Sequence, residues 1–149
     1  MGRMMGLKDV FLTNLRQIHT DGGDVFHGLK SNENSFFGFG EAYFSNILPG
    51  KIKGWKLHKR MTMNLIVPSG KVKFVLFDKT IESFQEETIG TSNYCRLTVP
   101  PNIWVAFQGL DYQKPNIVFN LANLEHDPKE VCKLDLDQIE YDWSLIDKA

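Results

Sequence analysis

The feature that most constrains the fold is a series of short apolar runs, each closed by turn-forming residues. In the run 71–77, Val72, Phe74 and Leu76 alternate with other residues and share one face, as a half-buried strand requires. Similar runs lie at 10–12, 41–48, 61–67, 97–99, 102–110 and 116–121, with Gly, Pro, Asn and Asp clusters between them. This pattern predicts an all-β antiparallel sandwich or barrel, with a short helical segment confined to the last twenty residues.

Length and composition limit the other possibilities. With 149 residues, of which 42% are hydrophobic and 23% charged, residues 1–149 are expected to form one globular domain. A net charge of −1 argues against nucleic-acid and membrane-surface partners, and no apolar run approaches a membrane span. The first six residues lack the apolar run of a secretory signal, and Cys95 and Cys132 show no CxxC pairing. A cytoplasmic location is therefore expected.

Residues 50–70 resemble the first cupin signature, a Gly, five residues, His-x-His, then a Glu and a closing Gly. The spacing is kept, but Lys56 stands at the first His and Met63 at the Glu. Residues 100–105 resemble the second signature, with Val105 in place of its His. Because a first-row metal needs three or more protein ligands and only His58 remains, we expect no metal and no other cofactor.

A closer resemblance is to two families of cupins that act on nucleotide-linked keto-sugars. Residues 52–59, Ile-Lys-Gly-Trp-Lys-Leu-His-Lys, are similar to Leu-Arg-Gly-Phe-His-Ala-His-Lys of the dTDP-sugar 3,4-ketoisomerases. Residues 97–101 are similar to Leu-Trp-Ile-Pro-Pro of the dTDP-4-dehydrorhamnose 3,5-epimerases, whose order the tail 126–143 also follows. The resemblance covers residues 8–145. It implies an RmlC-like cupin jelly-roll barrel, a homodimer and a nucleotide-sugar substrate.

These enzymes move a proton next to a ketone, which needs a base, an acid and a cation or donor for the enolate oxygen. Lys56 matches the epimerase base, and Phe119 matches its acid, a Tyr. His58 lies two positions beyond Lys56 on the same strand face, so it is a candidate base, whereas Lys56 would first need a lowered pKa. Tyr43, in a strand similar to the ketoisomerase Val-Tyr-Tyr-Ile-Phe, is the candidate acid. The candidate substrate-binding residues are Lys53, Arg60, Asn64, Arg96, Asn46 and Phe119, with Arg60 and Arg96 as possible diphosphate clamps.

The predicted function is epimerisation at C3 or C5 of a nucleotide-linked 4-keto-6-deoxyhexose, for O-antigen or other lipopolysaccharide and capsule sugars. The loss of the hydroxyl at Phe119 favours a single epimerisation over a double one. Two alternatives stay open. The longer Gly-x-x-x-His spacing and Tyr43 favour a 3,4-ketoisomerase. Lys56 and Phe119 instead favour a non-catalytic sugar-binding cupin.

Overall fold

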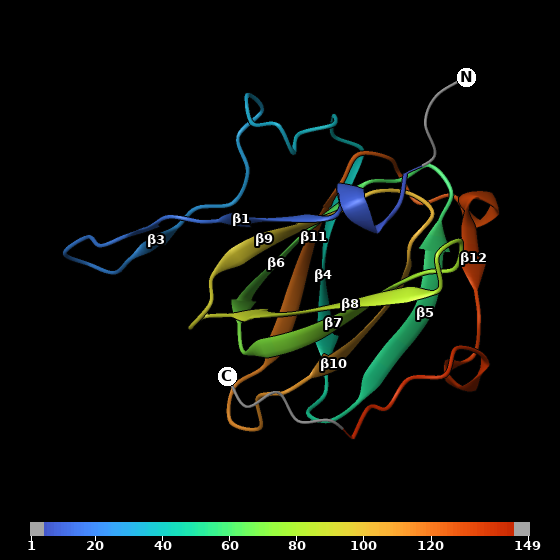
Figure 1. Ribbon diagram of the computed structural model, residues 1–149. Coiled ribbons are helices and arrows are strands. Elements are labelled where there is room, and N and C mark those ends of the chain that lie inside the picture. The colour runs from blue at the N-terminus through green and yellow to red at the C-terminus, as the bar shows by residue number, and fades with distance from the viewer. Residues whose placement is uncertain (1–4, 145–149) are drawn as a thin grey trace.

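The computed structural model describes residues 5–144, which form two five-stranded antiparallel sheets packed face to face (Figure 1). The first sheet has the strand order β1 (Phe11–Asn14), β9 (Cys95–Val99), β6 (Met63–Ser69), β11 (Asn116–Ala122) and β4 (Glu41–Ile47). The second sheet has the order β12 (Val131–Lys133), β5 (Ile52–His58), β10 (Trp104–Gly109), β7 (Lys71–Asp78) and β8 (Ser83–Gly90). This is the jelly-roll architecture that the sequence predicts.

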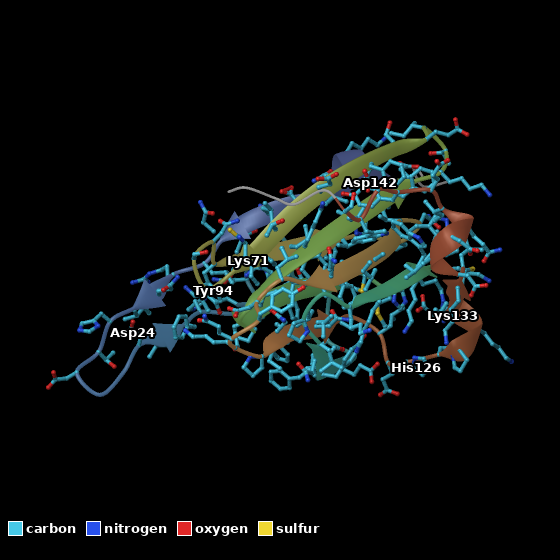
Figure 2. The ribbon with its side chains drawn as sticks, turned by 90° about the horizontal axis from the view of Figure 1, so that it is seen from below. Asp24, Lys71, Tyr94, His126, Lys133 and Asp142 are labelled. Carbon is cyan, nitrogen blue, oxygen red and sulfur yellow. The ribbon has the colours of Figure 1, made fainter. Side chains whose placement is uncertain are left out.

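Two kinds of element lie outside these sheets. A hairpin of β2 (Gln17–Ile18) and β3 (Val25–Phe26) projects from the body, with Asp24 near its tip (Figure 2). The helices are single 3₁₀ turns, η1 (Leu7–Asp9), η2 (Pro128–Glu130) and η3 (Leu136–Gln138). The expected C-terminal helical segment is therefore reduced to such turns, and its residues 145–149 lie outside the described part of the chain. Within residues 5–144, no helix has the length and apolar character needed to cross a bilayer.

The predicted runs from 41 onwards all contain strands, whereas β8 and β12 had no prediction. Strand β8 reads Ser-Phe-Gln-Glu-Glu-Thr-Ile-Gly, and most of it is exposed or half-buried at the edge of its sheet. Edge strands often carry charged side chains, because these discourage pairing with another chain, so a continuous apolar pattern is not required there. Strand β12 has three residues and is held by its pairing with β5.

Gly70 forms the tight turn from β6 to β7. Its φ is +80°, and a Cβ there would lie 2.5 Å from both Asn116 Oδ1 and the Pro115 carbonyl oxygen. Only glycine accepts this backbone and this close approach without strain. The turn places β6 in one sheet and β7 in the other, so the two inner faces begin to pack at this point.

Apolar side chains between the sheets form the main core. Alternate residues of β7 are fully buried there, as the period-2 pattern of Val72, Phe74 and Leu76 predicts. A second apolar cluster covers the opposite face of the β5–β10–β7 sheet, where C-terminal residues pack on Trp55, Val75 and Trp104. The β5–β10–β7 part of the second sheet therefore carries an apolar cluster on each face.

Candidate active site

A cavity of about 200 Å³ opens between the two sheets. It is smaller than the roughly 300 Å³ at the low end of typical ligand pockets, so it holds one small ring and a larger ligand must extend through the opening. Strands from both sheets and the segment before η2 line it. The lining residues are Tyr43, Ser45, Lys53, Gly54, Lys56, His58, Met63, Leu65, Val105, Phe107, Val118, Asn120, His126, Val131 and Lys133.

Strand β5 provides the most polar wall of the cavity. Lys56 and His58 point to the same side because they are two residues apart, while Trp55 and Leu57, which flank Lys56, pack on the opposite face. Gly54 lets β5 lie against β10, since a Cβ at this position would be 2.3 Å from the Ala106 Cβ. The packing of Trp55 outside thus fixes the direction in which Lys56 and His58 project inside.

His58 forms a buried pair with a carboxylate. Its side chain is 10% exposed, and its Nδ1 hydrogen-bonds to Oε1 of Glu130, whose side chain is 2% exposed. Glu130 Oε2 accepts hydrogen bonds from the backbone N–H groups of Arg60, at 3.1 Å, and Met61, at 3.2 Å. The pairing of β12 with β5, which places Val131 opposite His58, holds the two side chains together. Because Nδ1 is taken, Nε2 is the ring nitrogen left for a ligand in the cavity.

The charge of Glu130 follows from these contacts. Burial alone would raise its pKa, but the hydrogen bonds from His58 and from the backbone of Arg60 and Met61 lower it below its ordinary value. Glu130 is therefore a carboxylate at neutral pH. It accepts the Nδ1 proton of His58 and stabilises a positive charge on the ring.

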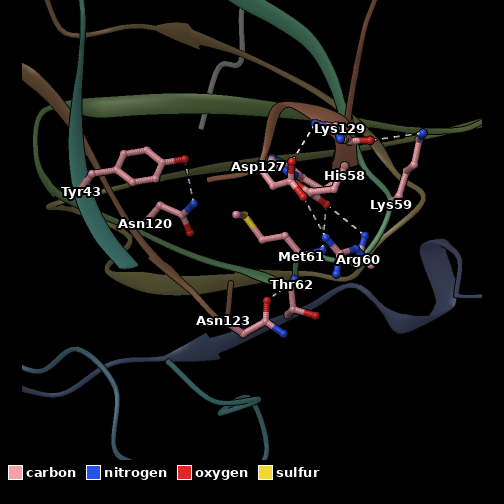
Figure 3. Close-up of polar contacts among 11 residues, drawn as sticks. Tyr43, His58, Lys59, Arg60, Met61, Thr62, Asn120, Asn123, Asp127 and Lys129 are labelled. Atoms are coloured by element: carbon pink, nitrogen blue, oxygen red, sulfur yellow. Dashed lines mark hydrogen bonds and ion pairs between the residues drawn. The ribbon is translucent and has the colours of Figure 1, made fainter. Parts of the chain in front are cut away.

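The opposite wall carries a tyrosine and an amide. Tyr43 of β4 and Asn120 of β11 are paired in register, and Asn120 Nδ2 donates to the Tyr43 hydroxyl oxygen at 3.1 Å. Figure 3 shows this pair on one side and His58 with the 127–129 segment on the other. The buried Oδ1 of Asn120 has no hydrogen-bond partner among the described residues. It is an acceptor that a ligand hydroxyl can satisfy.

Three lysines give the cavity its charge. Lys53 and Lys56 come from β5, and Lys133 of β12 stands opposite Lys56 in the strand register. No aspartate or glutamate is among the lining residues. Burial, followed by the charges of Lys133 and Lys53, lowers the pKa of Lys56. The arrangement suits an anionic or electron-rich ligand.

Four of the residues predicted from the sequence meet in this cavity, namely Tyr43, Lys53, Lys56 and His58. Asn46 and Phe119 do not reach it. Asn46 is exposed and follows Ser45, which lines the cavity, so its side chain lies on the other face of β4. Phe119 stacks on Phe44, with 4.5 Å between ring centroids, on the outer face of the sheet.

Asn64 and Arg96 also lie away from the cavity, in a buried polar network on the outer face of the first sheet. Arg96 donates to the Gly28 carbonyl at 2.5 Å, to Glu33 at 2.7 Å and to Ser35 Oγ at 2.6 Å. Asn64 Nδ2 donates to the Ser35 carbonyl at 2.8 Å. These side chains hold the 28–35 segment on the sheet, and Arg96 is fully buried. Arg96 is therefore not exposed to bind a diphosphate.

Arg60 lies at the surface. It forms a 3.2 Å ion pair with Asp127, and the two side chains are 63% and 42% exposed. It does not line the cavity. Within residues 5–144, no group of three or more His, Cys, Asp or Glu side chains is placed to hold a metal ion.

Four residues of the site had no role predicted from the sequence. Glu130 and Lys133 come from the η2–β12 segment, His126 from the segment before it, and Asn120 from β11. Lys133 and His126 lie at the same end of the molecule (Figure 2). His126 and Lys133 had no signal beyond their residue type. Asn120 follows Phe119 in β11, and successive residues of a strand point to opposite faces. Assigning the other face of β11 to the cavity would therefore have identified Asn120.

Comparisons with known proteins identify solved structures of the same fold. No family model and no curated protein sequence matches the chain. Among solved structures, a dTDP sugar isomerase from Desulfovibrio desulfuricans G20 shares 33% identity, with 94% of each chain covered and a TM-score of 0.87. A sugar 3,4-ketoisomerase from Thermoanaerobacterium thermosaccharolyticum, in complex with TDP, shares 17% identity over 90% of this chain and 93% of its own, with a TM-score of 0.74. A dTDP-4-dehydrorhamnose 3,5-epimerase from Sulfolobus tokodaii shares 18% identity over 94% and 84%, with a TM-score of 0.78.

Proposed function

The chain belongs to the RmlC-like cupin family of dTDP-sugar isomerases and epimerases, and from this membership we propose that it inverts one carbon next to the ketone of a nucleotide-linked 4-keto-6-deoxyhexose. It is a sugar-nucleotide isomerase, and the proposal concerns which isomerisation it performs. The observation that carries the proposal is the placement of the His58–Glu130 pair and the Tyr43–Asn120 pair on opposite walls of a cavity sized for one ring.

His58 is the base in this proposal. Its Nε2 takes the proton from C3 or C5, which the neighbouring ketone has made acidic. Glu130 holds the ring through Nδ1 and stabilises the imidazolium that forms. The enolate oxygen lies near the ammonium group of Lys53, which offsets the negative charge as it develops.

Tyr43 is the acid on the other face of the sugar. Because Asn120 donates to its hydroxyl oxygen, the hydroxyl proton is directed elsewhere and the phenolate left after proton transfer is stabilised. A proton removed by His58 on one face and returned by Tyr43 on the other inverts the carbon. This two-sided arrangement supports epimerisation.

A 3,4-ketoisomerase is the second candidate, supported by the 33%-identical structure, which is that of a dTDP sugar isomerase. That reaction moves a proton between neighbouring carbons, which one group on one face can carry out. The sugar-binding cupin without activity is disfavoured by family membership and by the intact His58–Glu130 pair.

The proposal also covers the nucleotide of the substrate, the oligomeric state and the cellular location. Two ketoisomerase structures of this fold hold TDP or TDP-4-keto-6-deoxyglucose, which supports a dTDP-linked substrate. Exposed aromatic residues on the projecting hairpin and β4, among them Phe26 and Phe44, support a homodimer that buries them. We place the reaction in the cytoplasm, in the synthesis of sugars for O-antigen and other surface polysaccharides.

The test is deuterium wash-in from heavy water with dTDP-, CDP- and GDP-linked 4-keto-6-deoxyhexoses, read by mass spectrometry and NMR. We expect label at one ring carbon with inverted configuration, and a loss of roughly 10²–10⁴-fold in His58→Asn, as for removal of a general base. A ketone found at C3 would establish the ketoisomerase instead. Binding without any label would contradict both enzymes and support the sugar-binding alternative.

A further inference from the structure

The lysine amines that line the cavity can do more than offset the negative charge of a ligand. Lys53, Lys56 and Lys133 line one small cavity to which residues 5–144 contribute no carboxylate. Like charges so placed repel one another, and the repulsion falls when one of them becomes a neutral amine. A neutral primary amine beside a bound ketone is a nucleophile.

Lys56 is the lysine best placed for this role. It lies two residues before His58 on the same face of β5, so its amine and the imidazole approach one ligand from the same strand. Lys133 faces it across the β12–β5 ladder, and Lys53 lies three residues before it. The other titratable side chains that line the cavity are Tyr43, His58 and His126, with Glu130 behind His58.

We propose that Lys56 attacks the C4 ketone of the sugar and forms an imine with it before His58 removes the neighbouring proton. This inference rests on the proposed function, because it assigns a nucleophile to the same cavity and the same substrate. Lys56 thereby differs from the base that its position in the family signature implies: it bonds to the carbonyl carbon, and the proton goes to His58.

The step balances without an oxidant or a cofactor. The lone pair of Lys56 Nζ bonds to C4, the carbonyl pair moves to oxygen, and the nitrogen gives up one proton, which that oxygen takes, so the nitrogen regains a lone pair. The hydroxyl group then leaves as water with a second proton, and the nitrogen pair closes the C=N bond of a protonated imine. At the end of the reaction one water adds to C4 and the amine leaves, so the ketone and Lys56 are restored.

The imine assists the proton transfer of the proposed mechanism. When His58 takes the proton from C3 or C5, the C–H pair forms a C=C bond and the C=N pair moves to nitrogen, giving a neutral enamine. A positive nitrogen is a stronger electron acceptor than a ketone oxygen, so the C–H bond is more acidic. Tyr43 returns a proton on the opposite face.

The environment of Lys56 favours the neutral amine that the attack requires. Partial burial in the cavity wall lowers its pKa, and the positive charges of Lys133 and Lys53 lower it further. A cationic neighbour is an established way to activate an imine-forming lysine. Lys59, the residue after His58, is exposed and donates to the Lys129 carbonyl away from the cavity, so it is a matched reference.

The imine also separates the two candidate reactions. If a proton moved from C3 to C4 while Lys56 was bound to C4, the product would be a C3 ketone joined to the lysine by a C–N single bond. Water cannot release such an amine. An enzyme that uses this imine therefore epimerises and does not ketoisomerise.

The experiment is reductive trapping. The protein is incubated with each of the three nucleotide-linked 4-keto-6-deoxyhexoses and sodium borohydride, and its peptides are analysed by mass spectrometry. We expect the mass of the reduced sugar nucleotide on Lys56 and none on Lys59. Lys56→Arg should abolish trapping and lower deuterium wash-in by about 100-fold or more, whereas Lys59→Arg should change neither. Wash-in within about threefold of wild type in Lys56→Arg, with no trapped peptide in the wild type, overturns the imine and leaves the proposed epimerase intact.

A substrate-free measurement covers the case in which none of the three sugars reacts. Limiting N-hydroxysuccinimide acetate is applied between pH 6 and 10, and acetylation of each lysine is followed by peptide mass spectrometry. We expect Lys56 to react at lower pH than Lys59, and to shift towards Lys59 in Lys133→Met, because removal of a cationic neighbour raises the pKa of Lys56. Identical profiles for the two lysines would overturn the inference whatever the substrate is.

Discussion

Two ion pairs, each with a buried basic side chain, occupy opposite sides of the first sheet, and they differ in what surrounds them. His58 pairs with Glu130 across 72 positions of sequence, and its ring borders the cavity. Arg96 pairs with Glu33 across 63 positions, and it is sealed beneath the 28–35 segment. Both pairs satisfy their charges with backbone contacts. The comparison teaches that a buried charge is a functional candidate only where it faces open space.

The physical reason is the cost of burying charge. An ion removed from water must recover its hydration energy from partners in the protein, and both pairs do so. Arg96 uses three partners to fix a segment and is fully buried, so a ligand cannot reach it. His58 uses one nitrogen for Glu130 and keeps the other for chemistry.

The largest expected effect is on the stability of the fold, and it comes from the Arg96–Glu33 pair. Arg96→Met should lower the free energy of unfolding by about 3 kcal/mol, because Glu33 loses its partner and the Gly28 carbonyl loses its donor. Chemical denaturation of both proteins at pH 7 measures this difference. The folded variant should keep its turnover rate within about threefold of wild type. If kcat instead fell about 100-fold or more while stability stayed unchanged, Arg96 would act in catalysis, contrary to the comparison.

The pH dependence of the stability difference between wild type and Arg96→Met provides a control. Burial would raise the pKa of Glu33, but its hydrogen bonds with Arg96 and the Lys30 backbone, together with the charge of Arg96, lower it below 4.5. A carboxyl with a lowered folded pKa contributes stability above its unfolded value, and this contribution is lost as pH falls through the folded pKa. The stability gap between wild type and Arg96→Met should therefore narrow below pH 4.5. A constant gap would show that the Glu33 charge is not involved.

The sequence identified more of the fold than of the site. Strand runs and turns predicted the sandwich, because the alternation of Val72, Phe74 and Leu76 reflects their shared packing in the main core. The site required knowledge of which face each strand presents. On β11 a shift of one residue exchanges Phe119 for Asn120, and the sequence placed the wrong one of the two in the pocket.

Contacts between residues far apart in the sequence explain why the roles of Glu130 and Arg96 were not predicted. Glu130 is 72 residues from His58, and nothing in its local sequence distinguishes it from the neighbouring acidic residues of the tail. Arg96 was expected to clamp a diphosphate because a guanidinium group can bind phosphate oxygens through paired hydrogen bonds. The same group binds carbonyl and carboxylate oxygens inside a protein, so residue type alone could not separate the two roles.

The second prediction concerns the pair at the cavity. Glu130→Gln should lower kcat by about 10- to 100-fold with KM nearly unchanged, as for loss of a partner that orients a functional histidine. The amide can still accept from the backbone of Arg60 and Met61, but it cannot stabilise an imidazolium as a carboxylate does. Steady-state kinetics on the substrate identified by wash-in provide the measurement.

A matched change gives this prediction its control. Asp127→Asn removes a carboxylate three residues away that pairs with Arg60 at the surface. We expect its kcat to stay within about twofold of wild type. Equal losses in the two variants would mean that negative charge near η2 matters in general, and the positioning role of Glu130 would be lost.

The smallest effect on stability should come from the exposed Arg60–Asp127 ion pair. Arg60→Ala removes an ion pair whose side chains are 63% and 42% exposed, so solvent already screens most of the attraction. Exposed pairs contribute about 0–1 kcal/mol, and the unfolding free energy should change within that range. The sequence also predicted Arg60 as a substrate ligand, and KM tests that prediction separately from stability. A KM unchanged within about twofold would leave Arg60 as surface charge only. A KM raised tenfold at constant kcat would mean that the diphosphate, lying outside the small cavity, displaces Asp127 from Arg60. An exposed charged side chain would then be a functional candidate in the same way as one that lines a cavity.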